Sequence, residues 1–309
     1  MDRHPLVSVI MPCFNGAKFL HRGIESVFMQ TYPHIELIVV NDGSTDNSLG
    51  LLNSIQDSRL VIINQQNTGV CKARNNAIAL SKGQFIAFLD VDDTWEPECI
   101  SHLYQAFIKH PKTILAYCGW QNIGLPEGQG KPFIPPDYEQ SNKIESIFEN
   151  CCWPIHATLT RQWAINDAGG FDETLQTSED FLLWLKIASQ YRIFLVPEVL
   201  AYYHFHDGIQ ATQNPAKTAI NHWIAQKIFL KSDPTLQNKL NSIEIARLMH
   251  GELLRRGYDC YWKRDLKSAR TIFKAVMKTG YGSLQDWKYM LPCLLPYFLH
   301  SMLIKLMDQ

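Results

Sequence analysis

The chain has 309 residues, of which 46% are hydrophobic and 19% are charged. This composition is typical of a folded globular protein and excludes a mainly disordered chain. The length fits one catalytic domain of about 200–250 residues with a smaller appendage. A formal net charge of −1 argues against a general nucleic-acid binder, whose surface normally carries a basic excess.

The charge is unevenly distributed along the chain. Residues 1–230 contain 16 basic and 23 acidic side chains, a balance of −7, whereas residues 231–309 contain 13 and 7, a balance of +6. The sequence therefore predicts two parts of opposite charge.

The cysteines and the first residues of the chain indicate the cellular compartment of the protein. No two of the eight cysteines have the C-x-x-C spacing of a zinc or redox site, which favours free thiols in a reducing environment. The first residues lead directly into an apolar run, without the pattern of a signal peptide. We therefore expect a cytoplasmic protein.

The first 110 residues alternate apolar runs with helical patterns. Continuous apolar runs at 6–11, 35–40, 60–64 and 85–89 predict strands that are buried on both faces. Between the first two runs, Leu20, Ile24 and Val27 recur at helical spacing. This repetition predicts a doubly wound, mostly parallel α/β sheet with helices on both faces. Such sheets bind ligands beyond the carboxyl ends of their strands.

The remaining elements divide into a second α/β stretch and a helical region. Glycine and proline residues at 121–143 predict a loop over the binding edge. We then expect helices at 161–168 and 180–190, and strands at 193–196 and 199–203. Helical patterns follow at 217–230, 235–256 and 261–279. The predicted domains are a catalytic domain at 1–215, with a nucleotide-binding half at 1–110 and an acceptor half at 111–215, and an all-α appendage at 216–309.

The most informative motif is Asp90-Val91-Asp92-Asp93, which directly follows the fourth predicted strand. Three carboxylates so close together repel one another unless a cation or hydrogen-bond donors compensate them, which indicates Mg²⁺ or Mn²⁺. The alternative is a solvated acidic turn in which Asp93 or Thr94 caps the next helix.

Polar turns also follow the other three predicted strands, at 12–16, 41–46 and 67–69. Each could be an ordinary turn or helix cap, but together they would meet at one edge of the sheet. The chain lacks the G-x-G-x-x-G motif of dinucleotide-binding enzymes and has no P-loop. The pattern disfavours a hydride-transfer enzyme.

These motifs resemble those of glycosyltransferase family 2, whose members have the GT-A nucleotide-diphospho-sugar-binding fold. The resemblance covers roughly residues 5–210, and its strength comes from seven motifs in the family order. The matching segments are Val9-Ile10-Met11-Pro12-Cys13-Phe14-Asn15, Val39-Val40-Asn41-Asp42-Gly43-Ser44-Thr45-Asp46, Asn67-Thr68-Gly69 with Ala73-Arg74-Asn75, Phe88-Leu89-Asp90-Val91-Asp92-Asp93, Gly169-Gly170-Phe171-Asp172, Ser178-Glu179-Asp180 and Tyr203-His204-Phe205-His206.

The resemblance implies roles for residues in the first half of the chain. Asp42 resembles the acid that binds the nucleobase, Arg74 a side chain that faces the base or phosphates, and Asp90 the acid that binds the ribose. The full expected nucleotide-sugar set is Pro12, Phe14, Asn15, Asp42, Asn67, Arg74, Asp90 and Val91.

The resemblance also implies a metal site and a catalytic base. Asp92 matches the last acid of the D-x-D metal motif, and His206 matches a histidine that completes the site in some members, although His204 is an alternative. Asp180 matches the general base of inverting members, since a carboxylate can accept the proton of an attacking hydroxyl. Glu179 is a second catalytic candidate that would orient the acceptor. Alternatively, Asp180 only caps the following helix.

Two features bear on the acceptor. The chain lacks the Q-x-x-R-W motif and the membrane spans of the processive synthases, so we expect transfer of a single sugar. Trp153, His156 and Trp163 either line the acceptor site or belong to the core, and we favour the core.

The basic C-terminal region contains one weak tetratricopeptide-like helix pair, which is too little for a solenoid. Its last apolar stretch, from 290 to 307, is interrupted by two prolines, His300 and Lys305 and falls short of the roughly 20 residues of a membrane span. Basic residues beside an apolar helix favour peripheral docking on an anionic inner membrane surface. The alternative is that the last helix packs on the catalytic domain.

The resemblance and the residues together predict an inverting transferase that depends on Mn²⁺ or Mg²⁺. It would move one sugar from a nucleotide-diphosphate donor, with UDP-sugars favoured, to a saccharide or lipid-linked acceptor in cell-surface polysaccharide or glycolipid assembly. A nucleotidyltransferase would need a glycine-rich basic loop at 12–16, which this chain lacks. The remaining alternative is a sugar-nucleotide-binding or scaffold protein without transferase activity. Nucleic acid is not an expected partner.

Overall fold

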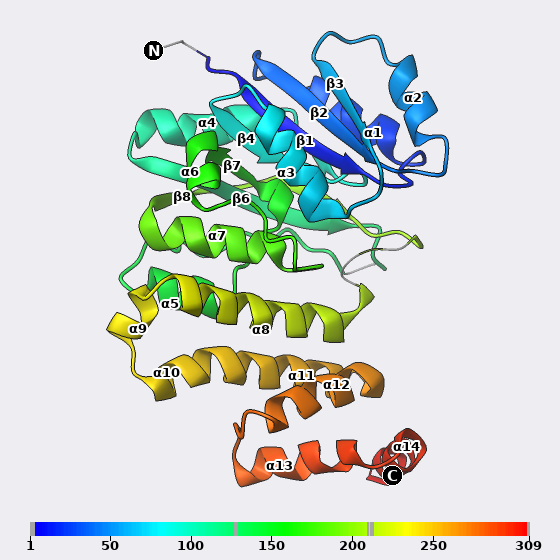
Figure 1. Ribbon diagram of the computed structural model, residues 1–309, viewed down its shortest axis with the longest axis vertical. Coiled ribbons are helices and arrows are strands. Elements are labelled where there is room, and N and C mark those ends of the chain that lie inside the picture. The colour runs from blue at the N-terminus through cyan, green and yellow to red at the C-terminus, as the bar shows by residue number, and fades with distance from the viewer. Residues whose placement is uncertain (1–3, 127–128, 209, 211–212, 308–309) are drawn as a thin grey trace. The chain divides into compact units, whose positions relative to one another are not determined.

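The computed structural model describes residues 4–126, 129–208, 210 and 213–307. The chain divides into two compact units, one formed by 1–143 with 151–207 and the other by 144–150 with 208–309. Figure 1 labels their elements along the chain.

The first unit is built on an eight-stranded sheet with the strand order β3-β2-β1-β4-β7-β6-β8-β5. The four predicted strands are confirmed as β1 (Val7–Cys13), β2 (Ile35–Asp42), β3 (Leu60–Gln65) and β4 (Phe85–Phe88). They pair in parallel, because α1 (Leu20–Phe28), α2 (Ser48–Ser54) and α3 (Val70–Leu80) carry the chain back between them. The apolar side chains of β1 and β4 are buried on both faces.

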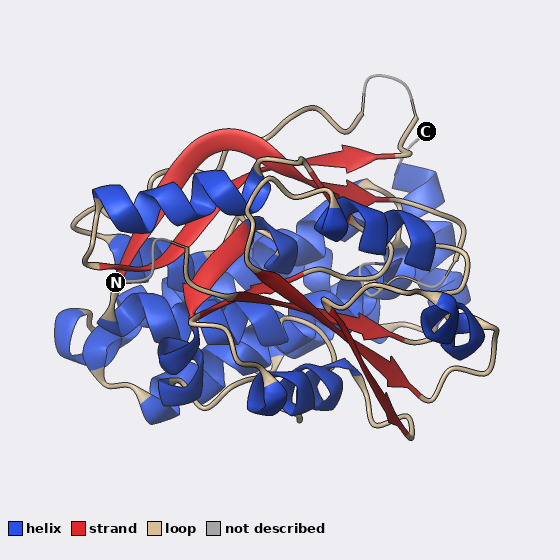
Figure 2. Ribbon diagram, turned by 90° about the horizontal axis from the view of Figure 1, so that it is seen from above, coloured by secondary structure: helices blue, strands red, loops and turns tan. Residues whose placement is uncertain are grey.

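The other half of the sheet is mixed. Strand β6 (Thr113–Ile123) pairs in parallel with β8 (Arg192–His204), while β7 (Thr158–Arg161) runs antiparallel to both β4 and β6. The two-residue strand β5 (Thr94–Trp95) pairs with β8 at the edge. Helices cover both faces, as predicted (Figure 2), and include α4 (Cys99–Lys109), α6 (Gln162–Asp167) and α7 (Glu179–Gln190).

The two strands predicted at 193–196 and 199–203 are one strand, β8. The pairing with β6 jumps from Val196 opposite Cys118 to Val199 opposite Gly119, so Pro197 and the residue after it bulge out. A proline lacks the N–H that a regular ladder needs, which explains the interruption in the pattern. The predicted loop at 121–143 is wrong at its start, because residues 121–123 still belong to β6, and its last residue, Lys143, begins α5 (Lys143–Glu149). Between these elements the described residues form no helix or named strand, and residues 127–128 lie outside the described part.

The second unit is helical. It contains α5 (Lys143–Glu149) from residue 144 on, α8 (Pro215–Ser232), α9 (Thr235–Lys239), α10 (Ser242–Ala246), a π-turn η3 (Arg247–Gly251), α11 (Glu252–Trp262), α12 (Leu266–Met277), α13 (Leu284–Met290), the 3₁₀ turn η4 (Leu291–Leu294) and α14 (Tyr297–Met307). Its core includes Leu253, Phe273 and Val276, and the last elements contribute Cys293 and Ile304.

The helix predicted at 235–256 is wrong as a single element. It stops at Lys239 and restarts at Ser242, because the Asn241 side chain accepts hydrogen bonds from the first turn of α10 while Glu244 bonds back to Asn241. Such a capping box begins a new helix. Within the described residues, no helix is both long and apolar enough to cross a membrane.

Candidate active site

The segment Asp90-Val91-Asp92-Asp93, here called the acidic turn, leaves the carboxyl end of β4. The amide of Asp93 donates to the carbonyl oxygen of Asp90 at 3.0 Å, which closes the turn. Helix α1 packs directly against it, since a Cβ added to Gly23 would lie 2.7 Å from the carbonyl oxygen of Val91. A glycine in α1 is therefore needed to hold the acidic turn where it is.

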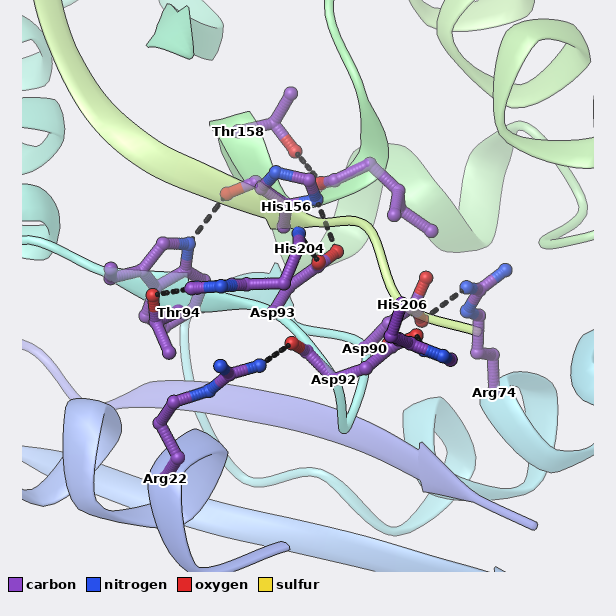
Figure 3. Close-up of polar contacts among 12 residues, drawn as sticks. Arg22, Arg74, Asp90, Asp92, Asp93, Thr94, His156, Thr158, His204 and His206 are labelled. Carbon is purple, nitrogen blue, oxygen red and sulfur yellow. Dashed lines mark hydrogen bonds and ion pairs between the residues drawn. The ribbon is translucent and has the colours of Figure 1, made fainter. Parts of the chain in front are cut away.

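Asp92 and His206, here called the metal pair, face each other across 3.0 Å between Oδ2 and Nε2 (Figure 3). The ring of Phe19 stacks on His206 with 4.3 Å between the ring centres, and Arg22 donates to the carbonyl oxygen of Asp92 at 2.6 Å. His204 points elsewhere, with its Nε2 at 2.8 Å from Thr94 Oγ1. The structure thus brings the imidazole of His206, and not that of His204, into contact with Asp92.

The metal pair has the donor chemistry of a divalent-cation site. Burial raises the pKa of Asp92, and the charges of Asp93 and Asp90 raise it further. A cation at this point would favour the ionised carboxylate and so oppose that shift, and a carboxylate with an imidazole suits Mn²⁺. No group of three or more His, Cys, Asp or Glu side chains that could hold a metal occurs among the described residues. The pair fits a cation that takes its other ligands from elsewhere, as Mg²⁺ commonly does from substrate phosphates and water.

Asp93 is fully buried behind the metal pair. Its Oδ2 lies 3.0 Å from Nδ1 of the buried His156, and its Oδ1 accepts from the backbone amide of His204 at 3.0 Å (Figure 3). Burial alone would lower the pKa of His156, but the Asp93 carboxylate raises it above its usual value. Asp93 therefore ties the end of β8, two residues before His206, to the acidic turn.

Arg74 connects the acidic turn to α7. This side chain on α3 is 2% exposed, and it donates to Asp90 at 2.6 Å and to Glu179 at 2.7 Å. The two carboxylates raise the pKa of Arg74 despite its burial. Arg74, the residue expected to face the base or phosphates, is thus enclosed between two acids. It connects the first turn of α7 to the acidic turn.

Asp180 lies in that first turn of α7. Its pKa is raised to about 7, first by burial and then by the charge of Glu179. The residue before the helix, Ser178, has the left-handed conformation with φ 61°, which is uncommon for a residue with a side chain. A carboxyl group with a pKa near neutrality can accept a proton from a substrate hydroxyl.

The end of β2 shapes the neighbouring loop. Both carboxylate oxygens of Asp42 accept backbone amides, Oδ1 from Thr68 and Oδ2 from Gly69, each at 2.9 Å. Gln65 also donates to Oδ1, and Asp42 is only 4% exposed. The carboxylate thereby holds the turn that carries the exposed Asn67, while its contact with a nucleobase stays a prediction.

The end of β1 meets the same edge. Asn15 adopts a left-handed conformation, and its Oδ1 accepts the amides of Thr45 and Asp46 at 2.8 and 3.3 Å. Pro12 is partly buried, and the Phe14 ring is half exposed. The expected nucleotide-sugar residues therefore gather along one side of the sheet, although their roles stay predictions.

The aromatic residues weighed for the acceptor differ in position. Trp153 is buried and stacks on Tyr117, and His156 is buried beside Asp93, as the core interpretation requires. That interpretation is wrong for Trp163, which is 48% exposed and touches Tyr191 edge-on. Trp163 lies on the solvent side of the short helix α6, and the buried positions of this helix are Ala164 and Ile165.

Two contacts of the metal pair had no signal in the sequence. Phe19 reads as an ordinary apolar residue next to α1, and Arg22 as a cation on its polar face. Both reach the site because α1 packs beside the acidic turn, a proximity that follows from sheet order and not from spacing.

Comparison with known proteins identifies the family. The family profile described as "Glycosyl transferase family 2" matches residues 8–158. An uncharacterized glycosyltransferase of Rickettsia typhi is 31% identical over 214 residues, which are 66% of this chain and 65% of the relative. A glycosyl transferase of Escherichia coli K12 named for colanic acid biosynthesis, WcaA, is 28% identical over 70% of this chain and 79% of its own length.

The fold has known counterparts. The crystal structure of Staphylococcus aureus TarS residues 1–349 in complex with UDP-GlcNAc superposes with a TM-score of 0.65 at 20% identity, covering 87% of this chain and 79% of TarS 1–349. The likeness is one of fold, and the match with the rickettsial relative spans about two thirds of that protein's length. With its sheet order, its acidic turn and these matches, the chain belongs to glycosyltransferase family 2 and has the GT-A fold.

Proposed function

We propose that the protein transfers a single sugar, with inversion, from a nucleotide-diphosphate donor to an acceptor hydroxyl. A UDP-sugar is the favoured donor, which the UDP-GlcNAc complex of TarS supports. Assembly of a cell-surface polysaccharide or glycolipid is the favoured setting, which the name of the Escherichia coli relative supports.

The observation that carries this proposal is the double ion pair of Arg74. It joins Asp90 of the acidic turn to Glu179 of α7, so that the metal pair and Asp180 belong to one connected cluster. In the proposed reaction the metal pair serves the leaving diphosphate and Asp180 serves the attacking hydroxyl.

The chemistry follows from these two ends. Asp180 in its ionised form accepts the proton of the acceptor hydroxyl while that oxygen forms a bond to the anomeric carbon. The bond from the anomeric carbon to the diphosphate oxygen breaks, and the nucleoside diphosphate leaves with the electron pair. A Mn²⁺ or Mg²⁺ ion held by the metal pair would supply positive charge for that leaving group. Attack opposite the leaving group inverts the configuration.

Asp180→Asn tests the assignment of the base. We expect nucleotide-sugar binding to persist while transfer falls by roughly a hundredfold or more, because asparagine cannot accept the proton. Glu98→Gln, at an exposed carboxylate outside the cluster, is the control and leaves transfer unchanged. Unchanged transfer in Asp180→Asn would refute the base. Donor binding without transfer in the wild type, over a panel of sugars and acceptors, would favour a sugar-nucleotide-binding protein instead.

The proposal includes a location. The protein would act at the cytoplasmic face of the inner membrane through a peripheral contact, since the basic balance of residues 231–309 suits an anionic surface. Co-fractionation of the full chain with membranes, reversed by high salt, is the expected result.

A further inference from the structure

The second unit exposes a continuous run of large apolar side chains. In residues 291–302, here called the apolar segment, Leu294 is 62%, Phe298 68% and Met302 59% exposed. The other exposed apolar members are Leu291, Leu295, Tyr297 and Leu299. Isolated exposed apolar residues are normal, but a contiguous patch of this kind marks an interaction surface.

Helix α12 carries a row of cations, here called the basic stripe. Lys267, Arg270, Lys274 and Lys278 follow one another at intervals of three and four residues, which places them on one face of the helix. The sequence of α12 contains no acidic residue. The three lysines are exposed, and none forms an ion pair with another described residue.

Arg270 joins the basic stripe to the apolar segment. Its Nη2 donates to the carbonyl oxygen of Leu295 at 2.7 Å, and its guanidinium lies 5.9 Å from the centre of the Tyr297 ring. Burial raises the pKa of the Cys293 thiol to about 11, and the nearby charges of Arg270 and Lys274 partly offset that rise. The cations and the apolar side chains therefore form one surface of this unit.

Polar atoms at this junction lack partners. The Nη1 atom of Arg270 and both ring nitrogens of His300 are buried without a hydrogen bond within the described chain. His300 is 0% exposed, and burial together with the Arg270 charge lowers its pKa. These atoms are enclosed within the unit, so the exposed lysines and the exposed apolar side chains are the groups that this surface offers to a partner.

We propose that the apolar segment and the basic stripe form a docking surface for an anionic phospholipid bilayer. This inference rests on the proposed peripheral location and names the surface that makes the contact. The apolar side chains enter the interface while the lysines face the headgroups, and these two signals together give stable attachment. A second copy of the chain is the less suitable occupant, because a two-fold contact would oppose two basic stripes.

Vesicle flotation of the full chain tests the proposal. Vesicles of phosphatidylcholine alone are compared with an equimolar mixture of phosphatidylcholine and phosphatidylglycerol. We expect binding to the mixed vesicles only, weakened by high salt. Phe298→Ser and Lys274→Glu should each lower the vesicle partition coefficient by about tenfold or more.

Two exposed positions of the same unit outside the surface supply matched controls. Ile243→Ser removes a 79% exposed apolar side chain from α10, and Lys231→Glu reverses an exposed charge on α8, and neither should change binding. Arg270→Gln keeps a donor for the Leu295 carbonyl oxygen but removes one positive charge of the basic stripe, and it should weaken binding to the mixed vesicles.

Three results would overturn the inference. They are equal binding to both kinds of vesicle, equal effects of the test and control variants, and a concentration-dependent dimer that Phe298→Ser abolishes. Donor binding and transfer to a soluble acceptor are measured on the same variants. Vesicle binding by a wild-type protein that shows no transfer contradicts the proposed transferase activity and leaves the docking surface standing. Transfer without vesicle binding contradicts the docking surface and the proposed location and leaves the transferase activity standing.

Discussion

The ion pairs of Arg74 allow a stability prediction for Arg74→Met. The substitution keeps much of the side-chain volume but removes the guanidinium between Asp90 and Glu179. Glu179 has an 11% exposed side chain and would lose its partner in a place that water scarcely reaches. The Asp90 side chain is 33% exposed, so solvent can partly replace what it loses.

The expected magnitude follows from this difference in exposure. Removing one member of a buried ion pair costs about 3–5 kcal/mol, because the remaining charge stays desolvated. The Asp90 contact adds little, since it is screened, and Met limits the cavity cost. We therefore expect the free energy of unfolding to fall by about 3 kcal/mol.

Urea unfolding followed by circular dichroism measures this change, and two further variants make it specific. Lys72→Met removes a neighbouring cation of the same helix, whose contact with Glu173 is exposed, and should cost less than about 1 kcal/mol. The double variant Arg74→Met with Glu179→Gln removes both charges and should recover at least about 1 kcal/mol of the loss.

The reasoning would be refuted if Arg74→Met cost no more than Lys72→Met. It would also fail if the effects of Arg74→Met and Glu179→Gln simply added, because an intact buried pair requires a coupling energy between its members.

Three further predictions concern the catalytic unit. Transfer needs the ionised base, so the transfer rate should rise with pH through about 7, the value of the Asp180 pKa. Glu179→Gln removes a charge that raises this pKa and should move the rise to lower pH. Initial transfer rates measured across the pH range test both expectations, and a rise at the same pH in Glu179→Gln would contradict the second. Gly23→Ala places a methyl group against the carbonyl oxygen of Val91 and should weaken donor binding by roughly tenfold in calorimetry. Asp93→Asn weakens the contacts of Asp93 with His156 and with the His204 amide, which support the metal pair. It should weaken Mn²⁺ binding by roughly 10–100-fold, measured by spin-resonance titration without the sugar donor. An unchanged Mn²⁺ affinity would mean that Asp93 contributes to the fold and not to the position of the metal pair.

The first four strands could be predicted because they are buried on both faces. Such strands appear as continuous apolar runs, and the predicted bounds of β1 to β4 differ from the structure by no more than two residues at either end. The same criterion missed β6, whose second half contains the polar residues Gln121 and Asn122, and β7, which alternates threonine with other residues. These segments become strands by pairing with partners distant in sequence, and no local pattern reports that.

The candidate site was predictable where a motif follows a strand or begins a helix. The acidic turn and the first turn of α7 are local in sequence, and both lie where expected. The contact between Arg74 and Glu179 joins positions 105 residues apart, so it follows only from how α3 and α7 pack. The sequence could therefore indicate the chemical groups, Arg74 among them, but not the contact through which Arg74 connects them.

Repulsion among the three carboxylates of the acidic turn first indicated a metal, and the structure shows which groups relieve that repulsion. Three carboxylates in four residues need compensation, and the acidic turn sends each one in a different direction. Asp90 pairs with Arg74, and Asp93 is enclosed with His156, so protein groups already compensate two of the three. Asp92 is left with the imidazole of His206, and burial together with the two neighbouring charges raises its pKa. The proposed cation would thus compensate one carboxylate and not three. Substitution of Asp93 should therefore act on metal binding through the position of the pair and not through the number of ligands.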